Sequence, residues 1–349
     1  MNFPSLFSPL TIGPYHLKHR VVMAPLTRMR AARPSHAPRP LNAEYYAQRA
    51  TAGGLIIAEA SPVVASGVGN PDVPGVWSAK QVEGWREVVD AVHAKGGVIF
   101  LQLWHVERVL HSSFQPGGAL PVAPSAVPIS AEYKTLTADW KVSTYETPRA
   151  LETNEVAGVV DSFRQAAKNA FAAGFDGVEI HGANGYLLEQ FLQSRTNLRT
   201  DRYGGSIENR ARLLLEVTQA AIEVWGADRV GVRLSPYGIA SDSGEADPMP
   251  LYSHVVEALN PLSLAYLHFI EPRSSGAGRA EVDHQNVPAV MAVPPDLEGH
   301  PDFSRRVHGS ERGSRDRRRT CRRGRVRAHL HLEPRPAAAV AGRIPGHAL

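Results

Sequence analysis

The sequence contains very little cysteine, no long apolar run and, in its second half, no lysine. A single cysteine, Cys321, among 349 residues excludes a disulfide framework and any cysteine-based zinc site. No run approaches the roughly 18 consecutive apolar residues of a transmembrane helix. Residues 1–6 lack the basic start and apolar stretch of a signal peptide. We therefore expect a cytoplasmic protein with no membrane partner. No metal site is predicted either, because three histidines lack a second ligand at metal spacing: His93, His105 and His111.

The net charge of +4 is divided unequally along the chain. Residues 301–349 hold 13 arginines and 4 acidic side chains, a net charge of +9, whereas the first 300 residues hold 25 basic and 30 acidic side chains, a net charge of −5. No lysine follows Lys168, and the tail is rich in arginine, proline, histidine, glycine and alanine. The basic isoelectric point therefore belongs to the tail, and the body carries no signature of nucleic-acid binding.

Short apolar runs alternate with stretches of helical periodicity along most of the chain. The apolar runs are residues 21–25, 54–60, 98–103, 177–181, 230–234 and 265–270. Helices are expected after Ser78, which forms a capping box with Gln81, over residues 153–173 and around 210–225. Repeated β–α units indicate a parallel sheet, either doubly wound or closed into a (β/α)8 barrel. The first strand is not followed by the Gly-x-Gly-x-x-Gly of a dinucleotide-binding sheet, which favours the barrel.

Four motifs stand at or after the expected strand ends, where a barrel places its active site. They are Met23-Ala24-Pro25-Leu26-Thr27-Arg28, Leu101-Gln102-Leu103-Trp104-His105, His181-x-x-Asn184-x-Tyr186, and Asp201-x-Tyr203-Gly204-Gly205-Ser206-x-Glu208-Asn209-Arg210. Their combination resembles the Old Yellow Enzyme family, nearest its N-ethylmaleimide reductase and xenobiotic reductase branch. The resemblance runs from about residue 6 to residue 273. It implies a (β/α)8 TIM barrel holding FMN. The flavin is reduced by NADPH or NADH and passes a hydride to an electron-poor small molecule, such as an enone, a maleimide or a nitro compound.

The resemblance also implies roles for individual residues. Thr27 would hydrogen-bond the flavin C4 oxygen, and Arg233 would sit near flavin N1 and the C2 carbonyl. His181 and Asn184 would grip the substrate oxygen, and Tyr186 would donate the proton. Trp104 would line the substrate pocket. The remaining side chains that would line the flavin are Ala24, Pro25, Leu26, Ala60, Gln102 and His181.

Physical chemistry agrees with these roles. A hydride arriving at the β-carbon pushes negative charge onto the substrate oxygen, where the two donors His181 and Asn184 would stabilise it. The α-carbon then needs a proton, which a phenol such as Tyr186 can give. A fixed cation at Arg233 would raise the flavin potential. Each residue alone also has a structural reading, for example Thr27 bonding its own backbone, so the case rests on the combination.

Two departures from the family pattern stand out. Glu107 occupies a place where the family usually has glycine, and a glutamate lacks glycine's freedom at positive φ, so we expect local distortion. After Arg273 the sequence shows neither of the last two strands nor the segments that bind the FMN phosphate in the family. We therefore expect the last two β/α units to be missing or replaced. Residues 1–273 would form the FMN-binding barrel, and residues 274–349 an aberrant, frameshifted or disordered Arg/Pro-rich tail.

Three interpretations stay open from the sequence. The chain is a working flavoenzyme, an inactive truncated barrel unable to hold FMN, or a non-enzymatic binding protein whose basic tail binds anions or nucleic acid. A nucleic-acid partner is not favoured, because no aromatic side chains are interleaved with the arginines of the tail. We expect a small-molecule substrate and a monomer or homodimer.

Overall fold

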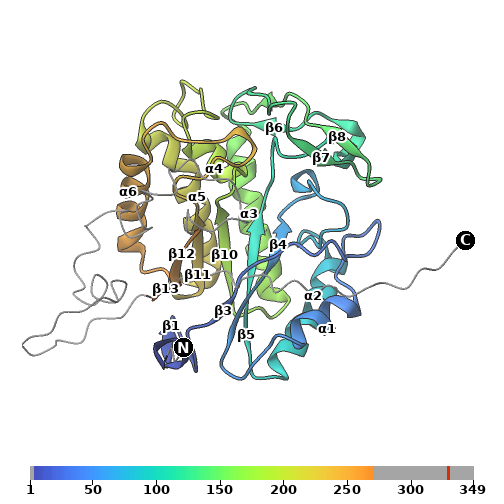
Figure 1. Ribbon diagram of the computed structural model, residues 1–349, viewed down its shortest axis with the longest axis vertical. Coiled ribbons are helices and arrows are strands. Elements are labelled where there is room, and N and C mark those ends of the chain that lie inside the picture. The colour runs from blue at the N-terminus through green and yellow to red at the C-terminus, as the bar shows by residue number, and fades with distance from the viewer. Residues whose placement is uncertain (1–3, 271–327, 331–349) are drawn as a thin grey trace, which may run out of the picture.

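The computed structural model of the protein describes residues 4–270 and 328–330. Its centre is a curled sheet of seven strands in the order β13-β12-β11-β10-β5-β4-β3, all paired in parallel (Figure 1). The strands are β3 (Val22–Met23), β4 (Leu55–Pro62), β5 (Val98–Trp104), β10 (Gly177–Gly182), β11 (Val230–Leu234), β12 (Tyr266–Phe269) and β13 (Ala328–Leu330). Each of the predicted apolar runs forms a strand, so the predicted parallel sheet is confirmed.

Neighbouring strands of this sheet follow one another in chain order. That order is typical of a (β/α)8 barrel, whereas a doubly wound sheet reverses direction at a switch point. One strand, β13, comes from the segment in which we expected none, and it pairs with β12 from Tyr266 to His268. The expectation of no strand after residue 273 is wrong to that extent. The rest of the predicted tail, residues 271–327 and 331–349, lies outside the described residues.

Helices cover the outer face of the sheet (Figure 1). They are α1 (Pro40–Ala47), α2 (Ala79–His93), α3 (Val156–Ala172), α4 (Leu187–Leu192), α5 (Ile207–Trp225) and α6 (Pro248–Leu259). The predicted capping box is confirmed, because the Gln81 N–H donates to the Ser78 hydroxyl and the Gln81 amide oxygen accepts from the Ser78 N–H at 3.0 Å. The apolar faces of α2, α3 and α5 bury Trp85, Phe163 and Leu214, respectively, against the strands. No helix of the described part of the chain could cross a membrane.

Short elements complete the described chain. A hairpin of β1 (Leu10–Ile12) and β2 (Tyr15–Leu17) packs on Phe100 and Tyr266 and covers the amino-terminal end of the sheet. The 3-10 helices are η1 (Pro4–Phe7), η2 (Ala65–Gly67), η3 (Ser112–Phe114), η4 (Pro116–Gly118), η5 (Ala227–Arg229), η6 (Ala240–Asp242) and η7 (Asn260–Leu262).

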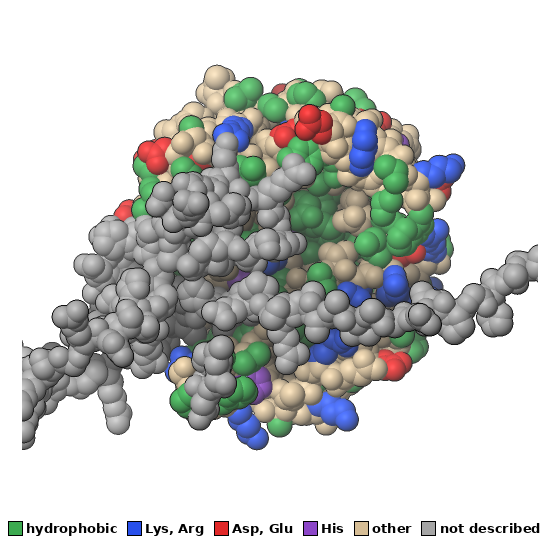
Figure 2. Space-filling view, in the orientation of Figure 1, with side chains coloured by type: hydrophobic (Ala, Val, Ile, Leu, Met, Phe, Trp, Pro, Cys, Tyr) green, Lys and Arg blue, Asp and Glu red, His purple; other side chains and the backbone are tan. Residues whose placement is uncertain are grey.

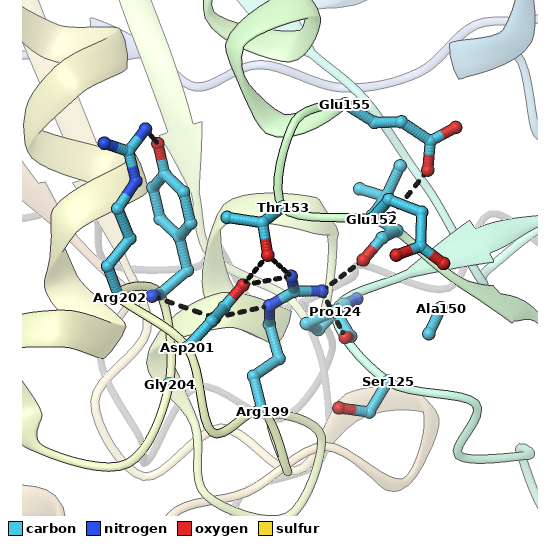
Figure 3. A network of polar contacts seen from close by, with 12 residues as sticks. Pro124, Ser125, Ala150, Glu152, Thr153, Glu155, Arg199, Asp201, Arg202 and Gly204 are labelled. Atoms are coloured by element: carbon cyan, nitrogen blue, oxygen red, sulfur yellow. Dashed lines mark hydrogen bonds and ion pairs between the residues drawn. The ribbon is translucent and has the colours of Figure 1, made fainter.

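The long connection predicted over residues 104–150 lies above the carboxyl ends of the strands (Figure 1). It contains β6 (Val122–Ala123), which pairs with β9 (Arg149–Ala150), and β7 (Lys134–Leu136), which pairs with β8 (Val142–Thr144). Arg199, between α4 and α5, is hydrogen-bonded to it (Figure 3). The guanidinium of Arg199 donates to the Pro124 carbonyl at 3.0 Å, to the Leu151 carbonyl and to Asp201. Arg199, held by Asp201 at the start of the predicted motif, therefore fixes this connection in place.

Candidate active site

A buried polar cluster crosses the inner face of four neighbouring strands. Gln102 on β5 lies opposite Glu179 on β10, and Arg233 on β11 lies opposite both His181 on β10 and His268 on β12. The Gln102 Nε2 donates to Glu179 Oε1 at 2.6 Å, and His268 Nδ1 lies 2.9 Å from Glu179 Oε2. All five side chains are buried. The parallel register therefore places Gln102, His181 and Arg233, three predicted site residues, in two adjacent rows that together form one inner layer.

The charges in this cluster follow from its burial. Although burial opposes ionisation, His268, Arg233 and the Gln102 amide together hold the pKa of Glu179 below its ordinary value. Burial lowers the pKa of Arg233, and the Glu179 charge acts in the opposite direction. Burial, together with the Arg233 charge, lowers the pKa of His181 well below its ordinary value. Near neutral pH the cluster thus contains one carboxylate, one guanidinium and a neutral His181.

A tight turn after β10 carries the predicted substrate ligands. Asn184 and Gly185 both have positive φ, +61° and +73°. The Asn184 N–H donates to Ser235 Oγ at 2.9 Å, and the Gly185 N–H donates to Glu189 Oε2 at 2.6 Å. A Cβ at Gly185 would lie 2.4 Å from the Ala240 carbonyl oxygen, so this position requires glycine. The hydrogen bonds from the backbone N–H groups of Asn184 and Gly185 fix the turn. The Asn184 side chain is therefore not needed to hold the turn in place.

Tyr186 stands between two other predicted site residues. Its ring centroid lies 5.0 Å from that of Trp104 and 5.2 Å from that of His181, both in edge-on geometry. Burial, with a smaller effect of Tyr145, raises the pKa of Tyr186 to about 12. The phenol is therefore protonated at neutral pH and can act as a donor. Figure 2 shows hydrophobic side chains gathered in a hollow in the upper part of this face, toward the end at which the strands finish.

The remaining predicted residues lie on or after β3 and β4, at one edge of the sheet. Ala24, Pro25 and Thr27, which follow β3, are half-buried, Leu26 is 56% exposed, and Ala60 on β4 is buried. The adjacent Arg28 N–H donates to Glu59 Oε2 at 2.8 Å, which fixes this segment against β4. Among the described residues, no hydrogen bond or ion pair joins these side chains directly to the cluster on β5, β10, β11 and β12.

Glu107 adopts the backbone conformation that its family position suggests. Its φ is +50°, and its side chain is buried with no hydrogen-bond partner for either carboxyl oxygen in the described part of the chain. His105 Nδ1 lies 3.5 Å from Glu107 Oε1, but burial lowers the pKa of His105 to about 4 and raises the pKa of Glu107 well above its ordinary value. Both groups are therefore neutral, and the pair is not an ion pair.

Four residues that the sequence analysis did not single out for the site belong to its supports: Glu179, Glu189, Ser235 and Tyr145. A signal for Glu179 was present in the sequence. Residues two apart on a strand face the same side, so the inward-facing His181 places Glu179 inward as well. Ser235 and Glu189 had no such signal, because they act through contacts between segments far apart in the chain or within a turn.

The cluster fits the polar edge of a flavin. The Arg233 Nε is buried without a hydrogen-bond partner within residues 4–270 and 328–330, and so is the His181 Nδ1. A buried cation with an unused donor calls for an acceptor, which the flavin N1 and C2 carbonyl supply. Within those same residues, no group of three side chains could hold a metal ion.

Comparison with known proteins agrees with this geometry. The profile of the NADH:flavin oxidoreductase / NADH oxidase family matches residues 5–293. The chain is 50% identical over 281 residues to 12-oxophytodienoate reductase 7 of Oryza sativa subsp. japonica, covering 79% of this chain and 71% of that protein. It is 49% identical over 275 residues to flavin oxidoreductase hxnT of Emericella nidulans, covering 77% and 70%.

Solved structures give the same result. Morphinone reductase in complex with tetrahydroNAD superposes with a TM-score of 0.73 at 48% identity, covering 79% of this chain and 76% of that one. The Old Yellow Enzyme homologue from Zymomonas mobilis superposes with a TM-score of 0.77 at 41% identity, covering 85% and 79%. The chain therefore belongs to the NADH:flavin oxidoreductase / NADH oxidase family, the Old Yellow Enzyme family of FMN-dependent oxidoreductases and ene-reductases.

Proposed function

We propose that this oxidoreductase reduces activated alkenes such as enones and maleimides, and also nitro compounds, with NADPH or NADH as the reductant. The observation that carries this proposal is the convergence of His181, Asn184 and Tyr186 at the end of β10, directly beside the buried Arg233. Two hydrogen-bond donors and a protonated phenol next to a cation are the groups that the reduction of a polarised double bond needs.

Each residue would have one task in this reaction. His181, which is neutral, and the Asn184 amide would donate hydrogen bonds to the substrate oxygen, where negative charge develops. Tyr186, whose phenol is protonated, would give its proton to the α-carbon. Trp104 packs edge-on against Tyr186 and would orient the phenol while forming a wall of the pocket.

FMN would be held by residues of the central strands and by the segment that follows the edge strand β3. When bound, FMN would supply the means of hydride transfer from the nicotinamide to the substrate. Arg233 and Gln102 would contact its polar edge, and Thr27 would donate to the C4 oxygen. Ala24, Pro25, Leu26 and Ala60 would line the ring, with His181 close to it. Arg233 would stabilise the negative charge that reduction builds on the flavin.

We further propose that residues 1–273 are the flavin-binding domain and that residues 274–349 are an aberrant tail, in which the reading frame is lost near residues 280–300. The family profile ends at residue 293, and the 13 arginines of residues 301–349 follow directly. Out-of-frame reading of GC-rich DNA yields such a composition. Re-sequencing of the gene tests this point, since a confirmed transcript with this tail in a single intact frame contradicts it.

Single-turnover reoxidation of the reduced enzyme tests the proposed substrates and ligands. The wild type is mixed with 2-cyclohexenone, N-ethylmaleimide or a nitroalkene, and so are His181→Ala and Asn184→Gly. Glycine is chosen at residue 184 because it keeps the positive φ while removing the amide. We expect each variant to be slower by roughly 100-fold or more, the typical effect of losing one donor to a developing oxyanion. Unchanged rates in both variants would reject the assignment.

A further inference from the structure

Glu179 is a buried acid with no assigned task in the reaction, yet it contacts or faces three polar side chains of the inner layer. It lies in the middle of β10 and has no solvent exposure. Its two carboxylate oxygens are divided between Gln102 on one neighbouring strand and His268 on the second strand to the other side. Burying a carboxylate is costly unless it is paired and hydrogen-bonded, so this arrangement requires an explanation.

The contact with Glu179 fixes the orientation of the Gln102 amide. An ionised carboxylate only accepts hydrogen bonds, so the group that lies 2.6 Å from Glu179 Oε1 must be the amide NH₂ of Gln102. The carbonyl oxygen of the same amide is then left to accept a bond from another partner. Without Glu179 the amide could rotate by half a turn and present its NH₂ group there instead.

The contact with Glu179 also fixes the tautomer of His268. Its Nδ1 lies 2.9 Å from Glu179 Oε2, so Nδ1 carries the proton and Nε2 is the acceptor. Burial and the Arg233 charge lower the pKa of His268, whereas Glu179 raises it. The pKa stays below its ordinary value, so the ring is neutral at neutral pH. His268 therefore adds no second positive charge beside Arg233.

A glycine lies on the strand between Glu179 and His268. Gly231 on β11 lies directly opposite Glu179, between Glu179 and the strand that carries His268. A Cβ at Gly231 would lie 2.4 Å from ring atoms of Tyr266, so no larger residue fits. The Glu179 carboxylate nevertheless reaches His268 across β11, and its charge also acts on Arg233, two residues further along β11.

We propose that Glu179 is a positioning residue for the flavin, which holds the Gln102 carbonyl toward the cofactor and offsets part of the Arg233 charge. The proposal rests on the proposed function, because it takes Gln102 and Arg233 as the residues at the polar edge of FMN. Two separate consequences follow, one for cofactor affinity through Gln102 and one for the flavin potential through Arg233.

We expect the reduction potential of the bound FMN to depend on the charge of Glu179. Glu179→Gln removes the negative charge and leaves Arg233 less opposed, which favours the more negatively charged reduced flavin. The reduction potential of the bound FMN then moves in the positive direction. Glu179→Asp keeps the charge but shortens the side chain by one methylene group. The potential then stays near that of the wild type while the hold on Gln102 is lost.

We expect the affinity for FMN to depend on the Gln102 amide. Gln102→Leu removes the amide and weakens FMN binding by about tenfold, the equivalent of one buried hydrogen bond. Glu179→Asp weakens binding in the same direction. If Glu179 acts through Gln102, the double variant Glu179→Asp/Gln102→Leu binds FMN no more weakly than Gln102→Leu alone.

The test uses the full chain, with FMN titrated into the flavin-free protein and the potential measured against a reference dye. Glu245→Gln is the matched control, because it also neutralises a buried acid paired with an arginine, Arg210, at 2.5 Å, but outside this layer. We expect a positive shift in Glu179→Gln, wild-type potentials in Glu179→Asp and Glu245→Gln, and non-additive losses of affinity.

Two results overturn the proposal. A wild-type potential in folded Glu179→Gln shows that Glu179 does not offset the Arg233 charge. Strictly additive losses of affinity in the double variant show that Glu179 does not act through the Gln102 amide. If Glu179→Gln does not fold, the affinity cycle with Glu179→Asp still decides the Gln102 part. A wild-type chain that binds no FMN at all rejects the proposed function itself, which distinguishes the two failures.

Discussion

The backbone N–H of Gly185 donates to the buried carboxylate of Glu189 at 2.6 Å. The same carboxylate accepts hydrogen bonds from Ser235 Oγ at 2.5 Å and from the Tyr252 hydroxyl at 2.7 Å. Ser235 in turn accepts from the Asn184 N–H. The turn that presents Asn184 and Tyr186 is therefore supported by one acid of α4, although in the described part of the chain no hydrogen bond joins that acid to either side chain.

Replacing Glu189 by glutamine loosens this turn. The amide offers one acceptor and one donor where three donors converge, so at least one hydrogen bond to a charged group is lost, worth roughly 1.5–3 kcal/mol. We expect kcat/KM for an enone to fall by about tenfold or more. Steady-state kinetics measure this, with Glu216→Gln as the control, because Glu216 accepts from Tyr203 away from the site.

The same residue predicts a pH dependence. Burial raises the pKa of Glu189 to about 7, against the lowering effect of its hydrogen bonds. The fully accepting carboxylate is present above about pH 7 and is lost as the pH falls through that value. We expect kcat/KM to rise between pH 6 and pH 8 in the wild type and this rise to disappear in Glu189→Gln. A rise of equal size in the variant assigns the titration to another group.

Tyr186→Phe separates proton donation from cofactor reduction. The ring and its packing on Trp104 stay, and the hydroxyl is removed. We expect alkene reduction to slow by roughly 100-fold or more, the typical contribution of a positioned acid. Flavin reduction by NADPH, which needs no proton from Tyr186, is expected to keep its rate. Stopped-flow measurement of both half-reactions checks this, and equal slowing of the two would indicate a general disturbance of the pocket.

Glu107→Gly is expected to stabilise the protein. The glutamate has a positive φ and a buried carboxyl group without a hydrogen-bond partner in the described part of the chain, and glycine removes both costs. We expect the free energy of unfolding to rise by about 1–3 kcal/mol. Urea denaturation measures the change, and lower stability of the variant would show that the Glu107 side chain makes a favourable contribution.

The stabilisation that Glu107→Gly provides is expected to increase as the pH rises. Burial raises the pKa of Glu107 in the folded state well above its ordinary value. Between the unfolded and the folded pKa, the unfolded chain loses the proton and the folded chain keeps it, so the wild type loses stability as the pH rises. The advantage of Glu107→Gly is therefore expected to be small near pH 4 and larger at pH 7.

Arg199→Lys tests the support of the long connection. The lysine keeps the charge but cannot make the several hydrogen bonds to Pro124, Leu151 and Asp201 (Figure 3). We expect a loss of about 2–4 kcal/mol in the free energy of unfolding, because buried acceptors are left unpaired. Faster proteolysis within residues 104–150 of the native protein is expected as well. Arg149→Lys, which alters an exposed ion pair with Glu155, serves as the control.

Local patterns were enough to predict the sheet. Apolar runs bounded by turn residues identified the strands, and Ser78 with Gln81 identified the start of α2. His181, Asn184 and Tyr186 were found because they lie close together in the chain. Glu189 and Arg199 were not assigned their supporting roles, since their partners come from segments 46 to 75 residues away or from backbone groups that carry no sequence signal. β13 was missed because its three residues carry no strand pattern of their own.

The visible spectrum of the purified full-length chain, with FMN added if the protein is colourless, tests the central claim most directly. The buried Arg233 with its unused Nε, beside Gln102 and His181, predicts a bound flavin that NADPH bleaches and 2-cyclohexenone reoxidises. A folded protein that takes up no flavin from excess FMN would contradict the account, because the catalytic side chains would then lack the cofactor that they serve.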